Sequence, residues 1–307
     1  MIERKRWGKK FKDYRDWRKY NEKLVVRGKF LLDCEWVKSW NSELEEMNDG
    51  KVGARYEYPD SMMKFLAPLH QWIDYRGLEG VLRKLVEFSE LPQASDYSNV
   101  CRCVNRMVVK FELPQSGSCC VSTDASGMKF EYVGEYRARM YGKRRKYIKV
   151  VISADPIRKK MIDCEVGIEG ELPSEPEVAT VHMESLMLKG IDVDKFFGDG
   201  SYDTHKVFAF LEKNGIEPAI KPRKNAVLEE GDCLRNREIT AIRKGYRQWA
   251  RKRQYGLRWN GTEGIFSAVK RKFGEQTRSH NIENAYNEIK RKFWAYDTMK
   301  EYGELHA

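Results

Sequence analysis

The spacing of apolar residues divides the 307-residue chain into a helical first third, a middle part dominated by strands, and a helical end. In the first part, apolar residues recur every three or four positions, which is the period of a helix with one buried face. A turn-forming stretch at 48–53 and the Leu91-Pro92 pair interrupt this pattern. The predicted helices span about 20–48, 60–73, 78–88 and 95–110.

The middle part contains short runs of apolar and β-branched residues separated by turn signals, which is typical of strands. We predict strands at about 118–123, 147–154, 160–168, 193–197 and 216–220, with a looser element at 129–137. Asp124 ends the first of these strands, before a turn at 125–127. Helices are predicted at about 177–188 and 204–213, the second capped by Asp203. Three antiparallel strands followed by helix, strand, helix and strand indicate an α/β fold with a mixed five-stranded sheet flanked by helices.

The helical end begins with a basic helix at about 235–253 and finishes with a helix that reaches about 302. Between them, a helix predicted from about Gly261 has one apolar stripe, made of Ile265, Phe266, Val269 and Phe273. At about 100° per residue, Glu263 and Lys270 fall within roughly 20° of each other at the border of that stripe. A carboxylate is therefore predicted where a helix enters the core. The alternative is a local role, in which Asn260 caps the helix and Glu263 completes a capping box.

Composition points to a polyanionic partner. The chain has 57 Lys and Arg against 46 Asp and Glu, a net charge of +11. Such a charge favours a nucleic acid, and a basic protein without that partner is the alternative. No apolar run is long enough to span a membrane, and the N-terminus is too charged for a signal peptide. The seven scattered cysteines match no disulfide framework or zinc pattern, so we expect free thiols in the cytoplasm.

Several basic stretches are candidates for contacts with a DNA backbone. Residues 1–20 interleave bases with aromatic residues, which suits either a DNA-binding arm or a helix packed on the protein. The short helices of 60–110 resemble a helix-turn-helix whose third helix directs Arg102 and Arg106 outward, and a plain helical bundle is the alternative. A base run among tyrosines and a loop after the last strand add Lys143, Arg144, Arg145, Lys221 and Arg223.

Three carboxylates are the candidates for catalysis. Asp124 and Asp199 each end a predicted strand, and these two strands are neighbours in the familiar sheet of this order. Glu263, on a later helix, would face them. Carboxylates gathered at one sheet edge suit Mg²⁺ or Mn²⁺, and two such ions can promote displacement at a phosphodiester. Local alternatives exist: Asp124 starts a turn, Asp199 belongs to an Asp-Gly turn, and Asp203 is a rival ligand whose predicted role is to cap a helix.

Four blocks of the sequence resemble the DDE transposases of bacterial and archaeal insertion sequences: TDASGMKF, KYIKVVISAD, FFGDGSYDTHKVFAFLEKNGIEPAIKPRKNA and RWNGTEGIFSAVKRKFGE. The resemblance covers about 118–295 and, more loosely, the N-terminal part. It implies an RNase H-like catalytic domain at 116–300, after a helical DNA-binding region at 1–115. It also implies an enzyme that cuts transposon ends and joins their 3′-hydroxyls to target DNA.

By position, the resemblance assigns roles to particular residues. The triad that binds metal and catalyses is Asp124, Asp199 and Glu263, and the family's Tyr–Arg–Glu–Lys signature falls on Tyr255, Arg258, Glu263 and Lys270. Arg258, Lys270 and the adjacent Arg271 would contact the end DNA. One spacing departs from the family, because four residues instead of three separate Arg258 from Glu263. This departure leaves the role of Arg258 open.

The prediction that follows is a metal-dependent transposase of the prokaryotic cytoplasm. It would act on terminal inverted repeats as a homodimer that pairs two ends, with two Mg²⁺ or Mn²⁺ ions as cofactors. An RNase H-like nuclease or resolvase is one alternative, and it would cut DNA without joining ends. An impaired copy that only binds transposon ends is the other.

Overall fold

The computed structural model describes residues 4–6, 9–11, 14–88, 90–113, 117–130, 147–168 and 170–307. The chain divides into two units. The first consists of Met1–Val100 together with Ala295–Ala307, and the second of Cys101–Trp294. The C-terminal helix therefore contributes its end to the first unit. The boundary between 115 and 116 that the resemblance implies stays a prediction.

Helices make up most of the first unit. Leu66, Leu78 and Leu82 are fully buried, so the apolar faces inferred from the sequence pack inward. The Asp74 carboxylate caps one helix by accepting a hydrogen bond from the backbone N–H of Gly77 at 2.7 Å. The elements are β1 (Arg4–Arg6), β2 (Lys9–Phe11), α1 (Trp17–Lys29), η1 (Phe30–Leu32), η2 (Glu35–Ser39), α2 (Trp40–Asn48), α3 (Asp60–Leu69), α4 (Tyr75–Glu87) and the start of α5 (Tyr97–Arg106). The three short helices predicted between 60 and 110 are thus confirmed as α3, α4 and α5.

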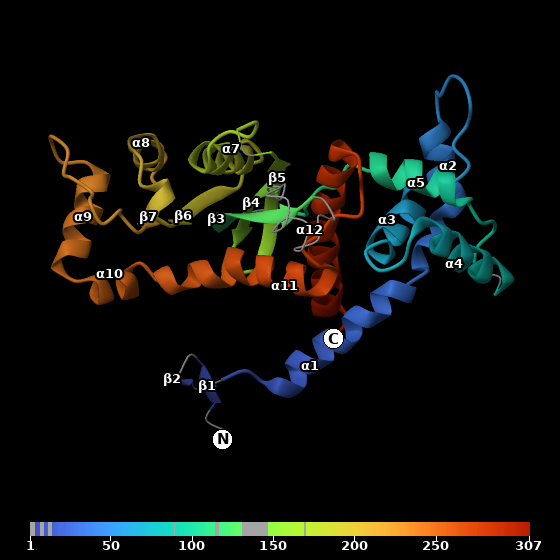
Figure 1. Ribbon diagram of the computed structural model, residues 1–307, viewed down its shortest axis with the longest axis horizontal. Helices are drawn as coiled ribbons and strands as arrows, with labels where there is room; N and C mark the ends of the chain where they lie inside the picture. The colour runs from blue at the N-terminus through green and yellow to red at the C-terminus, as the bar shows by residue number, and fades with distance from the viewer. Residues whose placement is uncertain are drawn as a thin grey trace, which may run out of the picture. The chain divides into compact units, whose positions relative to one another are not determined.

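A five-stranded mixed sheet forms the centre of the second unit (Figure 1). Its order is β5-β4-β3-β6-β7, and the predicted α/β fold class is confirmed. The first three strands pair antiparallel, whereas β6 runs parallel to both β3 and β7. The strands are β3 (Ser118–Lys129), β4 (Tyr147–Asp155), β5 (Lys160–Gly167), β6 (Asp192–Gly198) and β7 (Glu217–Ile220).

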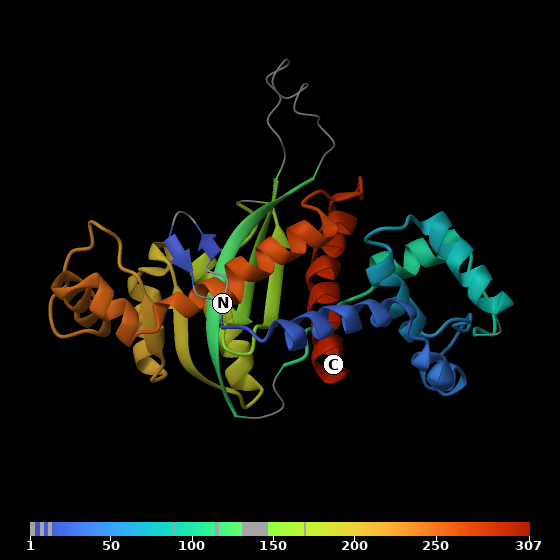
Figure 2. The same ribbon diagram turned by 90° about the horizontal axis from the view of Figure 1, so that it is seen from below.

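Helices cover both faces of this sheet. α7 (Glu175–Leu188) and α8 (His205–Lys213) lie over one face, and α10 (Tyr246–Lys252) and α11 (Gly264–Phe273) over the other (Figure 1). Figure 2 shows α11 lying across the strands. Because successive side chains of a strand point to opposite faces, Val121 joins the core under α7 and α8 while Cys120 packs against Trp249. The predicted apolar stripe of α11 is buried.

Two sequence predictions about local structure are wrong. β3 does not stop at Asp124 but continues through the predicted turn at 125–127 to Lys129, because β4 pairs with it residue by residue from Ser122 to Lys129. The predicted basic helix of 235–253 is two helices, α9 (Leu234–Lys244) and α10, separated by Gly245. In both cases pairing or packing in three dimensions outweighs local propensity.

A third correction concerns the start of α8. Its N-cap is Thr204, whose side chain accepts a hydrogen bond from the backbone N–H of Val207. Asp203, the predicted cap, instead accepts hydrogen bonds from the backbone N–H of Arg223 at 2.9 Å and from Nε of Arg235 at 2.7 Å. Asp203 therefore still has a structural role, but it holds the loop after β7 and not the helix.

The last helix, α12 (Ile282–Leu305), holds the segment that follows α11. Buried Glu288 accepts hydrogen bonds from the backbone N–H groups of Arg278 and Ser279, each at 3.0 Å. The same segment pairs with the end of β3, where the N–H of Lys129 donates to the carbonyl of Glu275 at 2.7 Å and the N–H of Thr277 donates to the carbonyl of Lys129 at 3.0 Å. These contacts fix the C-terminal end of α11 against the sheet.

No helix in the described part of the chain has both the length and the apolar character needed to cross a membrane. All seven cysteines are free thiols. The predicted base run with Lys143, Arg144 and Arg145 lies outside the described residues, as do the side chains of residues 1–13.

Gly198, at the end of β6, tests the packing at this edge of the sheet. A Cβ placed there would lie 2.8 Å from the ring of Tyr202, which is fully buried and has no room to retreat. We expect Gly198→Ala to lower the free energy of unfolding by about 1–3 kcal/mol through overpacking, measured by denaturant unfolding. Gly80→Ala is the control, since a Cβ on Gly80 in α4 meets nothing within 4 Å. Equal stability of the two variants would contradict this prediction.

Candidate active site

The parallel pairing of β3 and β6 brings two aspartates to the same level of the sheet. Ser122 of β3 lies opposite Phe197 of β6. Two residues further along each chain are Asp124 and Asp199, so they occupy matching positions on neighbouring strands. Asp199 lies just after β6 ends, whereas β3 continues beyond Asp124. Sequence analysis predicted this meeting, although it placed Asp124 at the end of a strand.

Glu263 comes to the same place on a helical segment of unusual geometry. Residues Trp259–Glu263 form a π-helical turn, η5, in which the N–H of Gly264 donates to the carbonyl of Trp259 five positions earlier. The turn packs tightly on the sheet, because a Cβ on Gly261 would lie 3.2 Å from Cβ of Ser122. Asn260 lies inside this turn and caps no helix. The alternative in which Asn260 and Glu263 form a capping box is therefore wrong.

The guanidinium of Arg258 lies between two of the three carboxylates. Its Nη2 donates to Oε1 of Glu263 at 2.7 Å, and its Nη1 lies 3.4 Å from Oδ2 of Asp124. The Arg258 side chain is only 11% exposed, so water screens these ion pairs weakly. Rings of Tyr255 and Trp259 flank the guanidinium, each with its centroid 5.8 Å away. The site therefore accommodates a positive charge between Asp124 and Glu263.

Burial and like charges act together on Asp124. The pKa of its carboxyl is raised from 3.8 to about 6, chiefly by burial, and the negative charges of Asp199 and Glu263 contribute to the rise. The backbone N–H of Ala125 and the charge of Arg258 oppose this rise without cancelling it. Desolvation and nearby carboxylates both disfavour an anion, so the charged form of Asp124 needs a cation close by.

Asp199 is held by its own loop. Its Oδ1 accepts hydrogen bonds from the backbone N–H of Ser201 at 2.8 Å and from the Ser201 hydroxyl at 2.6 Å. The hydroxyl of Ser201 is also 3.5 Å from Glu175, the first residue of α7. Asp203, the rival candidate, uses both carboxylate oxygens on Arg223 and Arg235. Its engagement leaves Asp199 as the better candidate ligand.

We tested whether these residues suit a divalent cation. Within the described ranges, no three Asp, Glu, His or Cys side chains converge closely enough to hold a metal ion as they stand. The donors nevertheless fit a hard cation, since they are carboxylate oxygens, and Arg258 already shows that positive charge is stabilised between Asp124 and Glu263. Arg258 would have to leave for a metal ion to bind there.

The predicted DNA-contacting residues are spread over several elements. Lys270 is anchored in the free protein, because its Nζ donates to the Ser126 hydroxyl at 2.9 Å and to the carbonyl of Gly127 at 2.8 Å. Tyr255 is buried and Arg271 is exposed on α11. The remaining predicted bases in the described ranges are exposed on α5 and on the loop after β7: Arg102, Arg106, Lys221 and Arg223.

Sequence reasoning missed two residues beside the carboxylates. Glu175 follows the capping residue of α7 and forms an ion pair with Lys149 at 2.8 Å. Tyr202 lies three residues after Asp199 and is fully buried. The sequence offers only weak signals for them. Tyr202 comes shortly after the Gly-Asp-Gly turn that contains Asp199, and Glu175 precedes Pro176 at a helix start.

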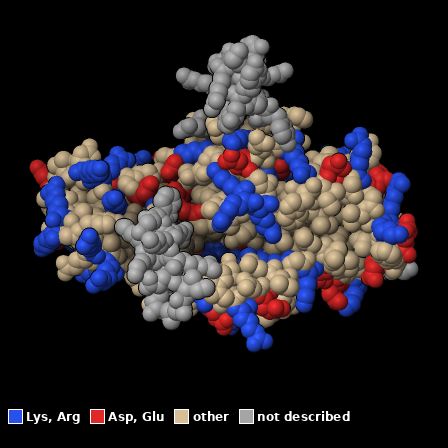
Figure 3. All heavy atoms as spheres, turned by 60° about the horizontal axis from the view of Figure 1, so that its bottom comes forward, with Lys and Arg blue, Asp and Glu red and all other residues tan. Residues whose placement is uncertain are grey.

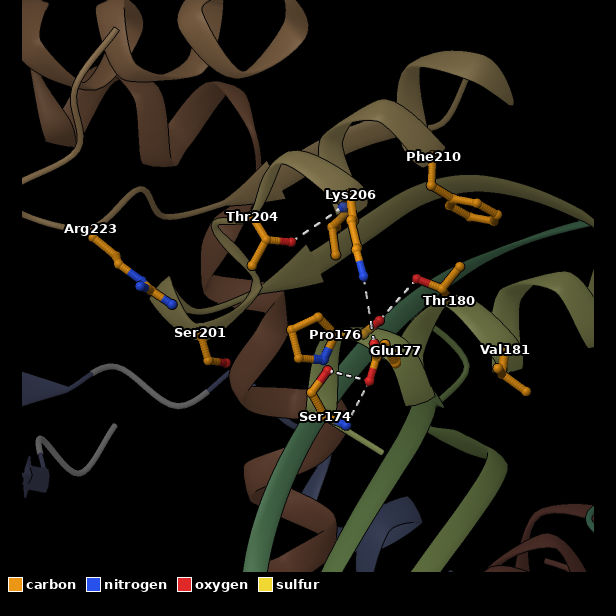
Figure 4. A pocket seen from close by; sticks show the side chains of 11 residues that line it. Ser174, Pro176, Glu177, Thr180, Val181, Ser201, Thr204, Lys206, Phe210 and Arg223 are labelled. Atoms are coloured by element: carbon orange, nitrogen blue, oxygen red, sulfur yellow. Dashed lines mark hydrogen bonds and ion pairs between the residues drawn. The ribbon is translucent and has the colours of Figure 1, made fainter. Parts of the chain in front are cut away.

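A groove of about 660 Å³ lies between α7 and α8, and Ser201 is one of the residues that line it (Figure 4). Most of its polar groups are engaged locally: Ser174 and Glu177 form a capping box, and the Thr180 hydroxyl donates to the carbonyl of Pro176. Lys206 reaches Glu177 at 3.9 Å. Most polar residues that line the groove therefore serve to stabilise helix ends. Ser201, which also lines the groove, hydrogen-bonds to Asp199.

The raised pKa of Asp124 gives a pH-dependent prediction. Because the folded-state pKa of about 6 exceeds the ordinary 3.8, the folded protein binds more protons than the unfolded chain between these values. The stabilising contribution of Asp124 to the free energy of unfolding is therefore present below about pH 4 and is lost as the pH rises through 6. We expect Asp124→Asn to raise the Tm at pH 8 in the presence of EDTA, with the gain shrinking towards pH 4. A difference in Tm that does not change with pH would contradict this explanation.

Comparison with known proteins relates the chain to transposases. A family model described as the transposase DDE domain matches residues 115–297, which include all three carboxylates. Among solved structures, the chain is similar to a cryo-EM structure of the piggyBac transposase synaptic complex with hairpin DNA. That likeness has 12% sequence identity and a TM-score of 0.39, and it covers 92% of this chain and 78% of the other.

The family model spans more than half of the chain and includes the sheet, Asp124, Asp199 and the helical segment with Glu263. The chain therefore belongs to the DDE-domain transposases.

Proposed function

We propose that this protein cleaves the ends of a transposon and joins their 3′-hydroxyls to target DNA, with Asp124, Asp199 and Glu263 as its catalytic carboxylates. The observation that supports this most is the β3–β6 register, which sets Asp124 level with Asp199. Arg258 links Glu263 to the same group. A nuclease or resolvase on the same sheet would cut DNA without joining ends.

The three carboxylates would hold one or two Mg²⁺ or Mn²⁺ ions. Bound there, such ions activate a water or a 3′-hydroxyl and stabilise the leaving oxygen of a phosphodiester. Asp124 is buried near Asp199 and Glu263, and both the burial and the like charges destabilise its charged form. A bound cation would relieve this destabilisation. The Ser201 hydroxyl and N–H orient Asp199.

Arg258 is proposed to exchange its partners when DNA binds. A guanidinium pairs equally well with a carboxylate and a phosphate, because its N–H groups fit two oxygens at once. Moving from Glu263 to a DNA phosphate would release the carboxylates and place a cation on the backbone. Lys270 and Arg271 are neighbours on α11, about two turns beyond Glu263, and would extend the same contact.

The π turn supports an active site over an impaired copy. In an α-helix, residues four apart share a face, whereas a π turn brings together residues five apart. Arg258 and Glu263 are five apart and in contact at 2.7 Å. The additional residue between them is thus absorbed without separating the two side chains.

Basic helices at one end of the second unit are proposed to hold the DNA backbone. Lys and Arg side chains gather at the end of this unit formed by α9 and α10 (Figure 3, left). Arg247 and Arg251 of α10 are both exposed, and their spacing of four puts them on one helix face. Arg102 and Arg106 of α5 would make similar contacts. Two copies of the chain would pair two transposon ends.

The carboxylate assignment is tested by Asp199→Asn, which keeps the shape of the side chain and removes its charge. With DNA that carries the element's own ends and Mg²⁺, we expect cleavage and strand transfer to fall below detection while end binding persists. Asp192→Asn, at the opposite end of β6, is the matched control and should remain active. Wild-type protein that cuts without joining would favour the nuclease, and binding without cutting would favour an impaired copy.

The basic surface is tested by the double variant Arg247→Gln/Arg251→Gln. Each lost phosphate contact should reduce the slope of log affinity against log salt by about 0.9, so we expect a reduction of about 1.8. The measurement is fluorescence anisotropy of labelled end DNA over a salt series. Lys206→Gln is the control, because Lys206 of α8 is exposed but lies outside α9 and α10 and pairs with Glu177 at 3.9 Å. A double variant with the wild-type slope would contradict the proposal that α10 contacts the DNA backbone.

A further inference from the structure

Tyr202 is a large, enclosed side chain three residues after Asp199. It ends the short helix η3 (Gly200–Tyr202) that begins after Asp199, and none of its surface is exposed. Its ring packs edge-on against Phe196, with centroids 5.4 Å apart, and lies against Gly198, which has no Cβ to obstruct it. These contacts involve only the ring of Tyr202, and a phenylalanine ring would make them equally well.

The hydroxyl of Tyr202 is not explained by packing. It is buried and has no hydrogen-bond partner within the described part of the chain. Leaving a buried polar group unpaired costs about 1–3 kcal/mol. Buried tyrosine hydroxyls usually find a partner. The cost indicates that a partner is supplied in another state of the protein.

The charges around this hydroxyl identify the kind of partner. Burial raises the pKa of Tyr202 well above its ordinary value, and the negative charges of Glu175, Asp124 and Asp199 raise it further. The phenol therefore stays protonated and can only act as a donor towards these anions. Ser201 joins two of the same carboxylates, with its hydroxyl 2.6 Å from Asp199 and 3.5 Å from Glu175.

We propose that Tyr202 is a positioning residue of the active site, whose hydroxyl donates a hydrogen bond to an oxygen of the cation-binding group when the cation is bound. The acceptor is a carboxylate oxygen of Asp199, which caps the short helix that Tyr202 ends, or a water held beside it. Such a bond adds to the hydrogen bonds from Ser201 that already orient Asp199, and it lowers the repulsion between the carboxylates. This inference rests on the proposed function, because it requires a cation at Asp124 and Asp199.

The test compares Tyr202→Phe with wild type in Mn²⁺ binding, measured by isothermal titration without DNA. Loss of a hydrogen bond to a metal ligand typically weakens affinity 10–100-fold, and we expect at least about tenfold here. A purely structural role predicts an unchanged Mn²⁺ affinity instead. In EDTA we expect a Tm equal to or above that of wild type, since the variant then loses only an unpaired buried hydroxyl.

Tyr58→Phe is the matched control. It also removes a single tyrosine hydroxyl, which donates to the carbonyl of Ala94 at 3.2 Å in the first unit. Mn²⁺ affinity should be unchanged in this variant. In strand cleavage, Tyr202→Phe should lower kcat while the affinity for end DNA stays that of wild type.

The outcomes separate this inference from the proposed function. If wild type and Tyr202→Phe bind Mn²⁺ equally while Asp199→Asn does not, the positioning role is overturned and the carboxylate site stands. If wild type binds no Mn²⁺, or Asp199→Asn binds as well as wild type, the proposed cation site fails and the role of Tyr202 fails with it.

Discussion

Like charges held close together in a partly buried site repel one another, and much of the second unit offsets that repulsion. Burial and the neighbouring carboxylates raise the pKa of Asp124 to about 6. Arg258 compensates from one side by contacting Asp124 and Glu263. Ser201 compensates from another by donating two hydrogen bonds to Asp199. The free protein is thus stabilised by a cation of its own where a divalent cation is proposed to act.

The same arrangement relates binding of DNA to assembly of the site. In the proposed exchange, Arg258 moves from Glu263 to a DNA phosphate, and the move releases the carboxylate. Lys270 is held in a comparable way by Ser126 and Gly127 of β3. Arg258 and Lys270, both proposed to contact DNA, are thus paired with groups of the protein itself in the free state, which limits the cost of burying them.

The three carboxylates lie on or next to elements of the sheet and its packed helices. Asp124 is on β3, Asp199 follows directly after β6, and a π turn packed through Gly261 on the sheet supplies Glu263. α12 fixes the segment after α11 through Glu288, and that segment pairs with the end of β3. A hydrogen-bonded frame of this kind would hold the proposed catalytic groups to within the small tolerance that chemistry demands.

The sequence by itself determined the order of the strands and helices, the buried stripe of α11, and the three carboxylates as candidates, because these depend on periodicity and on residue type. It misplaced the end of β3 and the cap of α8, where pairing with β4 and the ion pair of Asp203 with Arg235 outweigh local preference. Only the tertiary structure brought Arg258 between Asp124 and Glu263, since a π turn is not visible in a period of 3.6 residues. It alone also showed the unpaired hydroxyl of Tyr202, because burial without a partner is a property of the packed chain and not of the residue.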